Sequence, residues 1–424
     1  MKKGFKGIVL AAMTVASVAA LAACGTSSSG DKFGLIALHD ESSTYDANFI
    51  KGFKAACEAK KVEAKIVTGI PETNKCYEAA ADLADQGCKG VFADSFGHEA
   101  HIAKAASEFA DVQFSHATGT SSKYANKDQA NFHNAFASIY EGRYLAGVVA
   151  GLKLQEMEAA GKIEAKNKDA NGNIKLGYIG AYTYAEVISG YTSWYLGVKS
   201  IMPNVVMDVT FTGSWYDEVA EGNGANTLID GGAALISQHA DSMGAPSACE
   251  AKNVPNVSYN GSTAAKCPNT YLVSSRINWQ PYFEMMIEKT LAGESYAKDY
   301  CGTIETGSVE LAEYGKNVAA GTAEKIDEVK ANLKSGKLHV FDTSKFTVTV
   351  VAPDADGNNG KNAGATVDAD GHLTAYLADV DGDYKGDTNV VSNGYFDESN
   401  AEKYRSAPYF DLQIDGINLL NVKF

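Results

Sequence analysis

The feature that most constrains this chain is a regular alternation of short apolar runs with longer amphipathic segments, which starts at Phe33. The first run, Phe33–Leu38, precedes a segment in which Phe49, Phe53 and Cys57 recur at helical spacing. Parallel strands need a crossover between them, and a helix usually supplies it. The alternation therefore predicts an α/β fold, with parallel sheets covered by helices on both faces.

The alternation is interrupted by a polar stretch rich in Gly and Asn, residues 161–173, and then restarts. We expect two doubly wound lobes with a ligand cleft between them. Residues 32–165 form the first lobe in this prediction, and about 274–303 return to it. Residues 172–272 form the second lobe, and about 304–341 return to it.

Residues 342–424 differ in character and are expected to form a β-rich C-terminal extension. They are rich in Asp, Gly and Asn and contain alternating runs such as Phe346–Val351. Asp379, Asp381 and Asp383 match the start of a calcium loop, but Tyr384 and Val390 stand where that loop needs Gly and Glu. Asp-Gly is also a common hairpin dipeptide, so we favour turns here, as also at Asp354–Gly357 and Asp368–Gly371.

The N-terminus has the pattern of a lipoprotein signal peptide. Three lysines precede an apolar run that ends in Leu-Ala-Ala-Cys at Cys24. We expect residues 1–23 to be removed, Cys24 to carry the lipid, and residues 24–31 to act as a flexible tether. No later stretch reaches the roughly 18 apolar residues of a membrane span. The prediction is a body anchored by lipid to the extracytoplasmic face of the cell membrane; a plain secreted protein is the alternative.

Charge and cysteine content narrow the set of partners. The net charge is −15, and loss of the lysine-rich signal peptide makes it more negative, which argues against nucleic acid as a partner. Beyond Cys24 six cysteines remain, an even number that permits disulfides in an exported chain. Cys249 and Cys267 are the best candidate pair; free thiols are the alternative. No CxxC spacing indicates a structural zinc.

Candidate ligand-binding residues lie where predicted strands end and helices begin, which is where open α/β sheets bind ligands. Phe211–Asp217 supplies Trp215 and Tyr216, with Asp217 as a helix N-cap. Gln238–Gly244 supplies a second polar set. Its members are His239, Asp241 and Ser242. Flat rings with a few hydrogen-bonding groups suit a planar, polar, uncharged ligand.

The third predicted strand ends in Asp94, Ser95 and Phe96, which we add to the candidates. No histidine is spaced to serve Ser95 as a base, and GxSxG, P-loop and GxGxxG motifs are absent, so no enzymatic activity and no cofactor are predicted. His98 and His101 lie three apart on a predicted helix, where a solvated face is favoured over a metal site.

Six blocks, in the same order and spacing, make the sequence resemble the basic membrane protein family, the purine nucleoside or purine-binding lipoproteins of ABC importers. The resemblance covers about Lys32 to Phe341 and implies a type I periplasmic-binding-protein fold. The blocks are FADSFGHEA (92–100), FASIYEGRYLAGVVAG (136–151), LGYIGAYTYAEVISGY (176–191), FTGSWYDE (211–218), ALISQHADS (234–242) and YLVSSRINW (271–279).

The resemblance also implies roles for individual residues. Tyr45 and Trp215 occupy the places of two aromatics that sandwich a nucleobase. Asp94 lies where it could accept from a base N–H. Asn260 stands at the position of an acidic ribose contact, and Arg276 where the family commonly has lysine.

Three departures from the family pattern put nucleoside specificity in doubt. The family's Asp-Asp is Glu41–Ser42 here, its following Asn is Asp46, and its Gly-Ala-Asp is Gly232–Ala234. The sequence of residues 238–242, QHADS, resembles that of the family branch associated with free purine bases.

The predicted function is capture of a purine nucleoside or purine base between two lobes, for delivery to an ABC permease and its ATPase. The same fold binding a sugar or another small polar solute is the alternative. A surface adhesin or an extracytoplasmic enzyme is less favoured because no catalytic motif supports it.

Overall fold

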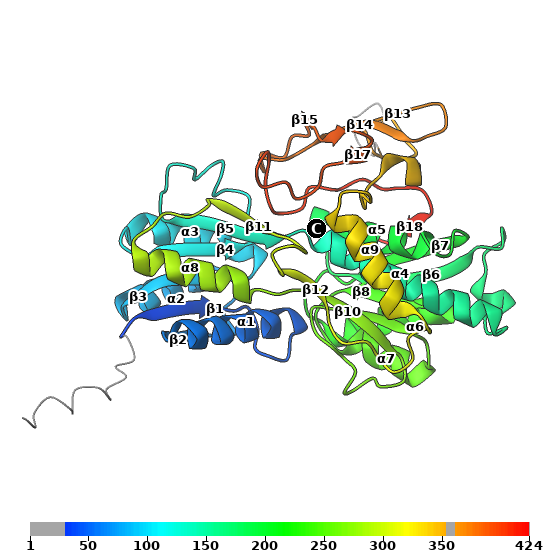
Figure 1. The fold of residues 1–424 in the computed structure, drawn as a ribbon, viewed down its shortest axis with the longest axis horizontal. Coiled ribbons are helices and arrows are strands. Elements are labelled where there is room, and N and C mark those ends of the chain that lie inside the picture. Colours follow the sequence, from blue (N-terminus) through cyan, green and yellow to red (C-terminus); the bar gives the residue numbers. More distant parts are fainter. Residues whose placement is uncertain (1–29, 353–360, 424) are drawn as a thin grey trace, which may run out of the picture.

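The computed structural model describes residues 30–352 and 361–423, which form two lobes and an extension beside them (Figure 1). The predicted signal peptide, Cys24 and the Asp354–Gly357 turn lie outside the described residues. The prediction of an α/β fold with two doubly wound lobes is confirmed.

The first lobe is built on a parallel sheet with the strand order β11-β5-β4-β3-β1-β2. Its strands are β1 (Lys32–Ile36), β2 (Glu63–Val67), β3 (Cys88–Ala93), β4 (Gln113–Ala117), β5 (Phe132–Ala137) and β11 (Asp299–Gly302). Its helices pack in two pairs on opposite faces. One pair is α1 (Thr44–Lys60) with α8 (Gln280–Ala292), and the other is α2 (Asn74–Asp85) with α3 (Glu99–Glu108), which the 3-10 turn η1 (Phe96–His98) precedes.

The second lobe is built on a sheet with the order β12-β10-β9-β8-β6-β7-β18, in which only β12 runs antiparallel to its neighbour. Its strands are β6 (Ile174–Gly180), β7 (Val205–Phe211), β8 (Ile236–His239), β9 (Asn256–Tyr259), β10 (Tyr271–Ile277), β12 (Val309–Leu311) and β18 (Ile417–Leu419). Its helices are α4 (Ile139–Ala159), α5 (Ala185–Lys199), α6 (Glu218–Asp230), α7 (Gly244–Lys252) and α9 (Thr322–Lys334), with the 3-10 turn η2 (Ala165–Asn167).

Helix α4 belongs to the second lobe, although the sequence places it in the first. It packs along α5 and against β10, so the chain crosses between lobes directly after β5. The cause is a pair of glycines at the helix crossing. A Cβ on Gly147 would lie 2.1 Å from the carbonyl oxygen of Trp194, and one on Gly197 would lie 2.1 Å from that of Tyr144. Only glycine allows these two backbones to approach so closely.

Helix α6 begins as predicted, with Asp217 as its N-cap accepting from the main-chain N–H of Ala220 at 2.9 Å. Its unfavourable Gly222 lies where α6 packs against the start of α7. A Cβ on Gly244 would lie 2.8 Å from the main-chain nitrogen of Gly222. Close approach of the two helices therefore requires glycine at Gly244, whereas a Cβ on Gly222 would meet its nearest neighbour at an ordinary 3.5 Å.

Besides β18, the described residues of the extension (342–352 and 361–423) contain only short strands, so this part is less β-rich than expected. They are β13 (Ala365–Val367), β14 (Leu373–Ala378), β15 (Thr388–Asn389), β16 (Val391–Ser392) and β17 (Tyr395–Phe396), with the 3-10 turn η3 (Thr343–Lys345). The expected strand over Phe346–Val351 does not form, because the hydroxyls of Thr347 and Thr349 bind the carboxylate of Asp415 instead. Asp368–Gly371 does form a turn, between β13 and β14.

Two predictions about single residues are wrong. His98 does not lie on a solvated helix face: it is fully buried, its Nε2 donates to the carbonyl of Ile70 at 2.9 Å, and burial lowers its pKa to about 4.

Cys249 and Cys267 are both buried but form no disulfide. All six cysteines of the described part are free thiols, as the alternative expectation had it.

Candidate functional site

A pocket lies between the lobes, at the carboxyl ends of strands from both sheets. It encloses about 380 Å³ of space that protein atoms do not occupy. The first lobe lines it with Leu38, His39, Tyr45, Asp46, Ser95, Phe96 and Thr118; the second lobe lines it with Glu186, Trp215, His239, Asp241 and Tyr259. The structure thus brings seven of the ten predicted site residues to one cavity.

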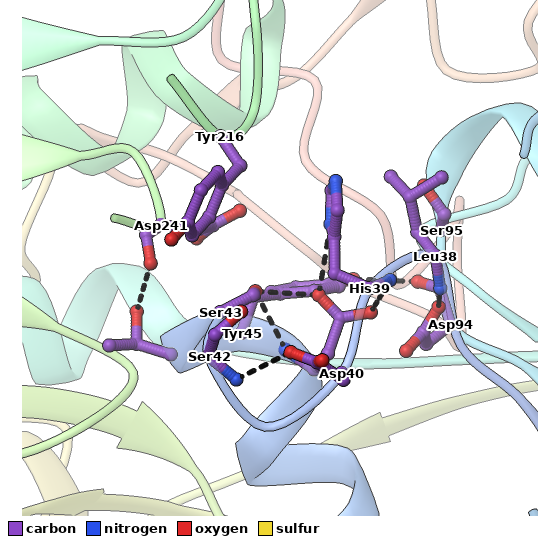
Figure 2. A network of polar contacts seen from close by, with 12 residues as sticks. Leu38, His39, Asp40, Ser42, Ser43, Tyr45, Asp94, Ser95, Tyr216 and Asp241 are labelled. Carbon is purple, nitrogen blue, oxygen red and sulfur yellow. Dashed lines mark hydrogen bonds and ion pairs between the residues drawn. The ribbon is translucent and has the colours of Figure 1, made fainter. Parts of the chain in front are cut away.

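Tyr45 is held on the first turn of α1 so that its ring faces this pocket. Ser43 caps the helix by accepting from the main-chain N–H of Asp46 at 3.2 Å. The Tyr45 hydroxyl donates to the main-chain carbonyl of Asp94 at 2.8 Å (Figure 2). The Tyr45 ring packs against Phe49 with centroids 4.8 Å apart. Fixed at both ends, the ring offers a rigid apolar surface.

Asp46 is committed mainly to its own loop. Its carboxylate accepts from the main-chain N–H of His39 at 2.7 Å and from the Ser43 hydroxyl at 2.6 Å, and Nδ1 of His39 lies 3.4 Å away. Burial opposes the ionisation of Asp46, but the hydrogen bonds from His39 and Ser43 outweigh this effect, so the pKa of Asp46 is lowered. Asp46 therefore orders the loop that carries His39 and Tyr45.

Asp94 lies behind the pocket wall and not on it, although Ser95 and Phe96 after it do line the pocket. One carboxylate oxygen accepts from the main-chain N–H of Leu38 at 3.2 Å, while Oδ2 has no partner. Burial, reinforced by the nearby Asp46, raises its pKa well above the usual range. We expect Asp94 to be protonated in this arrangement.

Trp215 projects from the loop that follows β7 and is half-buried. Its ring meets the edge of Tyr182 at 5.2 Å and is tilted against Tyr184 at 6.3 Å. Its main-chain carbonyl accepts from the N–H of Asp241 at 3.0 Å, which ties the ends of β7 and β8 together. The predicted convergence of these two strand ends is therefore observed.

Polar groups of the second lobe form the floor of the pocket. Nε2 of His239 lies 3.5 Å from a carboxylate oxygen of Glu186, and its ring is tilted against Tyr259 at 4.4 Å. Burial lowers the pKa of His239 despite the nearby Glu186. Nδ1 of His239 is buried without a hydrogen-bond partner and lies against Gly190 of α5.

Asp241 is buried, and its carboxyl group has few hydrogen-bonding side chains nearby. Nδ2 of Asn260 lies 3.5 Å from its Oδ1, and Asn260 adopts a left-handed backbone with φ of 62°. Burial, with repulsion from Asp46, Glu221 and Glu186, raises the pKa of Asp241 well above the usual range. A carboxyl kept neutral in this way can both donate and accept hydrogen bonds.

Beneath the floor lies Arg143, whose guanidinium is fully buried among neutral partners. Its Nη2 donates to the hydroxyls of Tyr178 at 2.8 Å and Ser237 at 3.0 Å. The guanidinium carbon lies 5.0 Å from the ring centroid of Tyr259. This cation braces the end of β8 from inside the lobe.

Arg276 lies outside the pocket, contrary to the carried-over expectation. Its Nε and Nη2 hold Oε1 of Glu310 at 2.8 and 2.5 Å, across the antiparallel pair β10 and β12. Asn260 reaches the pocket only through Asp241. The position of Glu310 on the neighbouring strand explains why Arg276 is turned away.

Sequence reasoning missed five lining residues. They are Leu38, His39, Thr118, Glu186 and Tyr259. Each follows or ends a strand of its sheet, so the rule that found Trp215 and His239 could have found them, had every strand been treated alike.

The remaining candidates for chemistry are engaged in structural contacts. The Ser95 hydroxyl donates to Glu72 at 2.6 Å, and the nearby His116 donates to the main-chain carbonyl of Ser95 at 2.7 Å. Ligand atoms of Asp379, Asp381 and Asp383 lie within 4.8 Å of one another. Asp379 accepts from the loop's own N–H groups, and Lys385 lies 2.6 Å from Asp383, as in an Asp-rich turn.

Comparison with known proteins agrees with this geometry. The family model described as ABC transporter substrate-binding protein, PnrA-like, matches residues 36–343. The chain belongs to this family. Its members are extracytoplasmic substrate-binding proteins of ABC transporters, and the recognised resemblance is thereby confirmed. Within the described residues, no helix has the length and apolarity that a membrane crossing requires.

Two relatives are named for different ligands. A purine-binding protein of Brucella abortus (strain 2308) is 29% identical over 281 residues, which cover 66% of this chain and 73% of that protein. A protein of Haloferax volcanii named as an ABC transporter glucose-binding protein is 27% identical over 256 residues, which cover 60% of each chain.

Solved structures show the same fold. A solute-binding protein from Conexibacter woesei superposes with a TM-score of 0.59 at 19% identity, over 73% of this chain and 98% of that one. A second, from Aeropyrum pernix K1, gives 0.58 at 13% identity, over 77% and 95%. These family and fold relationships are those of solute-binding proteins.

Proposed function

We propose that this substrate-binding protein captures a purine nucleoside or purine base in the pocket between its lobes and delivers it to an ABC permease driven by a separate ATPase. The observation that carries the proposal is that aromatic side chains of both lobes, Tyr45 and Trp215, line one narrow cavity. Stacking of a planar base on aromatic rings contributes roughly 1–3 kcal/mol per base. The purine-binding relative supports the same ligand class.

The polar groups of the pocket suit the edge of a purine. A purine edge presents both donors and acceptors, and the buried Asp241 with its raised pKa can supply both. Glu186, which lies beside Nε2 of His239 and lines the pocket, adds an acceptor. Anionic ligands gain little here, because no lysine or arginine is among the lining residues of the pocket.

Closure of the lobes is the proposed mechanism, and no chemical step is involved. A ligand that contacts both lobes favours the closed state over the open one by its differential affinity. The crossing segments after β5, β10 and β11 are short, so they are the natural hinges.

Attachment to the membrane through a lipid on Cys24 completes the proposal. Residues 1–23 would be removed, and the tether would keep the binding protein near its permease. Membrane fractionation of cells that express wild-type or Cys24→Ala protein tests this. Release of the variant into the soluble fraction is expected; unchanged retention would contradict the lipid anchor.

Binding measurements on ligand-free protein that starts after Cys24 test the ligand. The panel is adenine, hypoxanthine, adenosine, inosine and glucose, the last because one relative is named for it. We expect a purine to bind, Trp215→Ala to weaken it by about tenfold or more, and Trp215→Phe to weaken it less. Tyr314→Ala, an exposed aromatic outside the pocket, is the matched control. Binding of glucose with no response to any purine would overturn the proposal.

A further inference from the structure

The C-terminal extension, which begins where the family match ends at residue 343, packs on the second lobe (Figure 1). There β18 pairs with β7, and the main-chain N–H of Leu420 donates to the carbonyl of Val209 at 2.8 Å. The buried ring of Phe410 stacks on Phe341 with centroids 4.2 Å apart, and Phe341 packs against Tyr140 of α4 at 5.3 Å. Because they share a sheet and apolar contacts, we expect the extension to move with the second lobe.

Polar side chains of the first lobe hold the extension from the other side. Nζ of Lys123, on the loop after β4, donates to the main-chain carbonyl of Ala401 at 2.6 Å. Asp299, the first residue of β11, accepts from the main-chain N–H of Ser406 at 2.7 Å and from its hydroxyl at 2.5 Å. Nδ2 of Asn134 on β5 donates to the same Asp299 carboxylate at 2.9 Å and keeps it in place. The extension is thus bonded to both lobes.

The extension also lies beside the ligand pocket. A second cavity, of about 1380 Å³ and open to solvent, is lined by both lobes and by the extension, and it shares Phe96 and Trp215 with the pocket. Gly382 of the extension lies so close to the first lobe that a Cβ on it would be 2.6 Å from the hydroxyl of Thr120. The extension therefore covers one flank of the cleft between the lobes.

Opening of the lobes would move the extension, together with the second lobe, away from its first-lobe partners. Hydrogen bonds act over about 3 Å, so a small displacement is enough to break those of Lys123 and Asp299. The β18–β7 pairing lies within the second lobe and does not need to break. Neither Lys123 nor Asp299 lines the pocket, so these residues act on the movement of the lobes and not on the ligand.

We propose that Lys123 and Asp299 are affinity-determining residues outside the pocket, which latch the extension to the first lobe and thereby slow opening of the lobes and release of the ligand. The extension lies beyond the residues that the family model matches, so this latch adds to the hinge closure of the fold. The inference rests on closure of the lobes in the proposed function and not on the identity of the ligand.

Hydrogen exchange resolved to single amides tests the latch in the ligand-free protein. The main-chain N–H of Thr44 reports on opening, because it donates to the carbonyl of Asp241 in the other lobe. In the double variant Lys123→Met with Asp299→Asn, we expect Thr44 to exchange about tenfold faster, the order that one hydrogen bond to a charged group contributes. The N–H of Leu420, bonded between the extension and the second lobe, is the internal control and should not change.

Tyr191→Phe is the matched control variant, because it removes a bond that the latch does not use. The Tyr191 hydroxyl donates to Oε1 of Gln413 at 3.0 Å, which joins the extension to the second lobe. Its loss should leave the exchange of Thr44 unchanged. The half-buried Lys123→Met alone keeps the test decisive if the double variant does not fold, with an expected acceleration of about threefold. Exchange of Thr44 as fast in wild type as in the latch variants, or equally fast in Tyr191→Phe, would overturn the inference.

The release rate of bound ligand is the second readout. In stopped-flow measurements with hypoxanthine or inosine, release should be about tenfold faster from the double variant than from wild type, and unchanged in Tyr191→Phe. An unchanged release rate in the folded double variant would contradict the latch. Failure of wild type to bind either purine would contradict the proposed ligand instead, and the exchange of Thr44 would still decide whether the latch exists.

Discussion

The main-chain N–H of Thr44 donates to the main-chain carbonyl of Asp241 at 3.1 Å, and this bond joins the two lobes directly across the cleft. Thr44 is the first residue of α1, and Asp241 follows β8. A backbone bond between lobes exists only while they are closed. It therefore contributes to the closed state and not to the folding of either lobe.

Thr44→Pro is predicted to weaken ligand binding without destabilising the first lobe. Proline is well tolerated at the first helical position, where its missing N–H breaks no helical bond, and Ser43 before it is already extended with ψ of 130°. Loss of one hydrogen bond of the closed state should cost about 0.5–1.5 kcal/mol of binding free energy. Calorimetric titration with the cognate ligand measures this.

Thr44→Val is the control for this variant. It retains the N–H and loses only the weak contact of Oγ1 with the Asp241 carbonyl at 3.3 Å. Equal losses of affinity in the two variants would show that the backbone bond is not what closes the lobes.

The fold was largely predictable, because the alternation of apolar runs reports strands and helices locally. The lobe to which α4 belongs was not. Its assignment depends on the close approach of Gly147 to Gly197, which are 50 positions apart, and no local pattern reports such a pairing. The extension was mispredicted for a similar reason. The hydroxyls of Thr347 and Thr349 donate to the carboxylate of Asp415, a residue that is distant in the sequence.

Gly147→Ala is predicted to destabilise the protein strongly, by about 3 kcal/mol or more, because its Cβ would lie 2.1 Å from a carbonyl oxygen and would force α4 and α5 apart. Gly222→Ala is the matched helical control. Its Cβ would meet its first neighbour at 3.5 Å, an ordinary contact, so better helix propensity should raise stability by up to about 1 kcal/mol. Urea unfolding of both variants measures the free energies. Comparable values for the two would contradict the tight crossing.

The candidate site was predictable in position but not in detail. Strand ends gave Trp215 and His239 correctly, because the carboxyl ends of parallel strands share one edge of a sheet. This rule could not predict the orientation of Arg276, because Arg276 pairs with Glu310 on β12, a strand that the sequence analysis did not predict. Asp94 was placed near the pocket, but only the fold shows that its carboxyl turns behind the wall.

The thiols are predicted to be free and slow to react. Cys57, Cys76, Cys88, Cys249 and Cys267 are buried, and burial raises the pKa of Cys57 to about 12. Because the thiolate is the reactive form, a thiol reagent should label the native protein slowly. Titration in denaturant without reductant should then count all six thiols of the chain after Cys24. A count of four would show that one disulfide, such as Cys249–Cys267, had formed.

Glu398 is predicted to make the protein less stable as the pH rises. It is buried in the extension with Oε2 unpartnered, and burial raises its pKa from 4.5 to about 8, against the opposing hydrogen bond from Tyr409 and the charge of Arg405. The folded state therefore binds a proton that the unfolded state releases. The stability that this proton supplies is fully present below pH 4.5 and is lost as the pH rises through about 8.

Glu398→Gln should remove this dependence, because the amide is neutral at every pH and keeps an acceptor for the main-chain N–H of Tyr409. At pH 9 the variant should be more stable than wild type by about 1–3 kcal/mol, and at pH 5 the two should be nearly equal. Urea unfolding at the two pH values measures both differences, with the exposed Glu402→Gln as control. A gain of the same size at pH 5 and pH 9 would mean that the side chain is not protonated in the folded protein, and that its burial is compensated by charge.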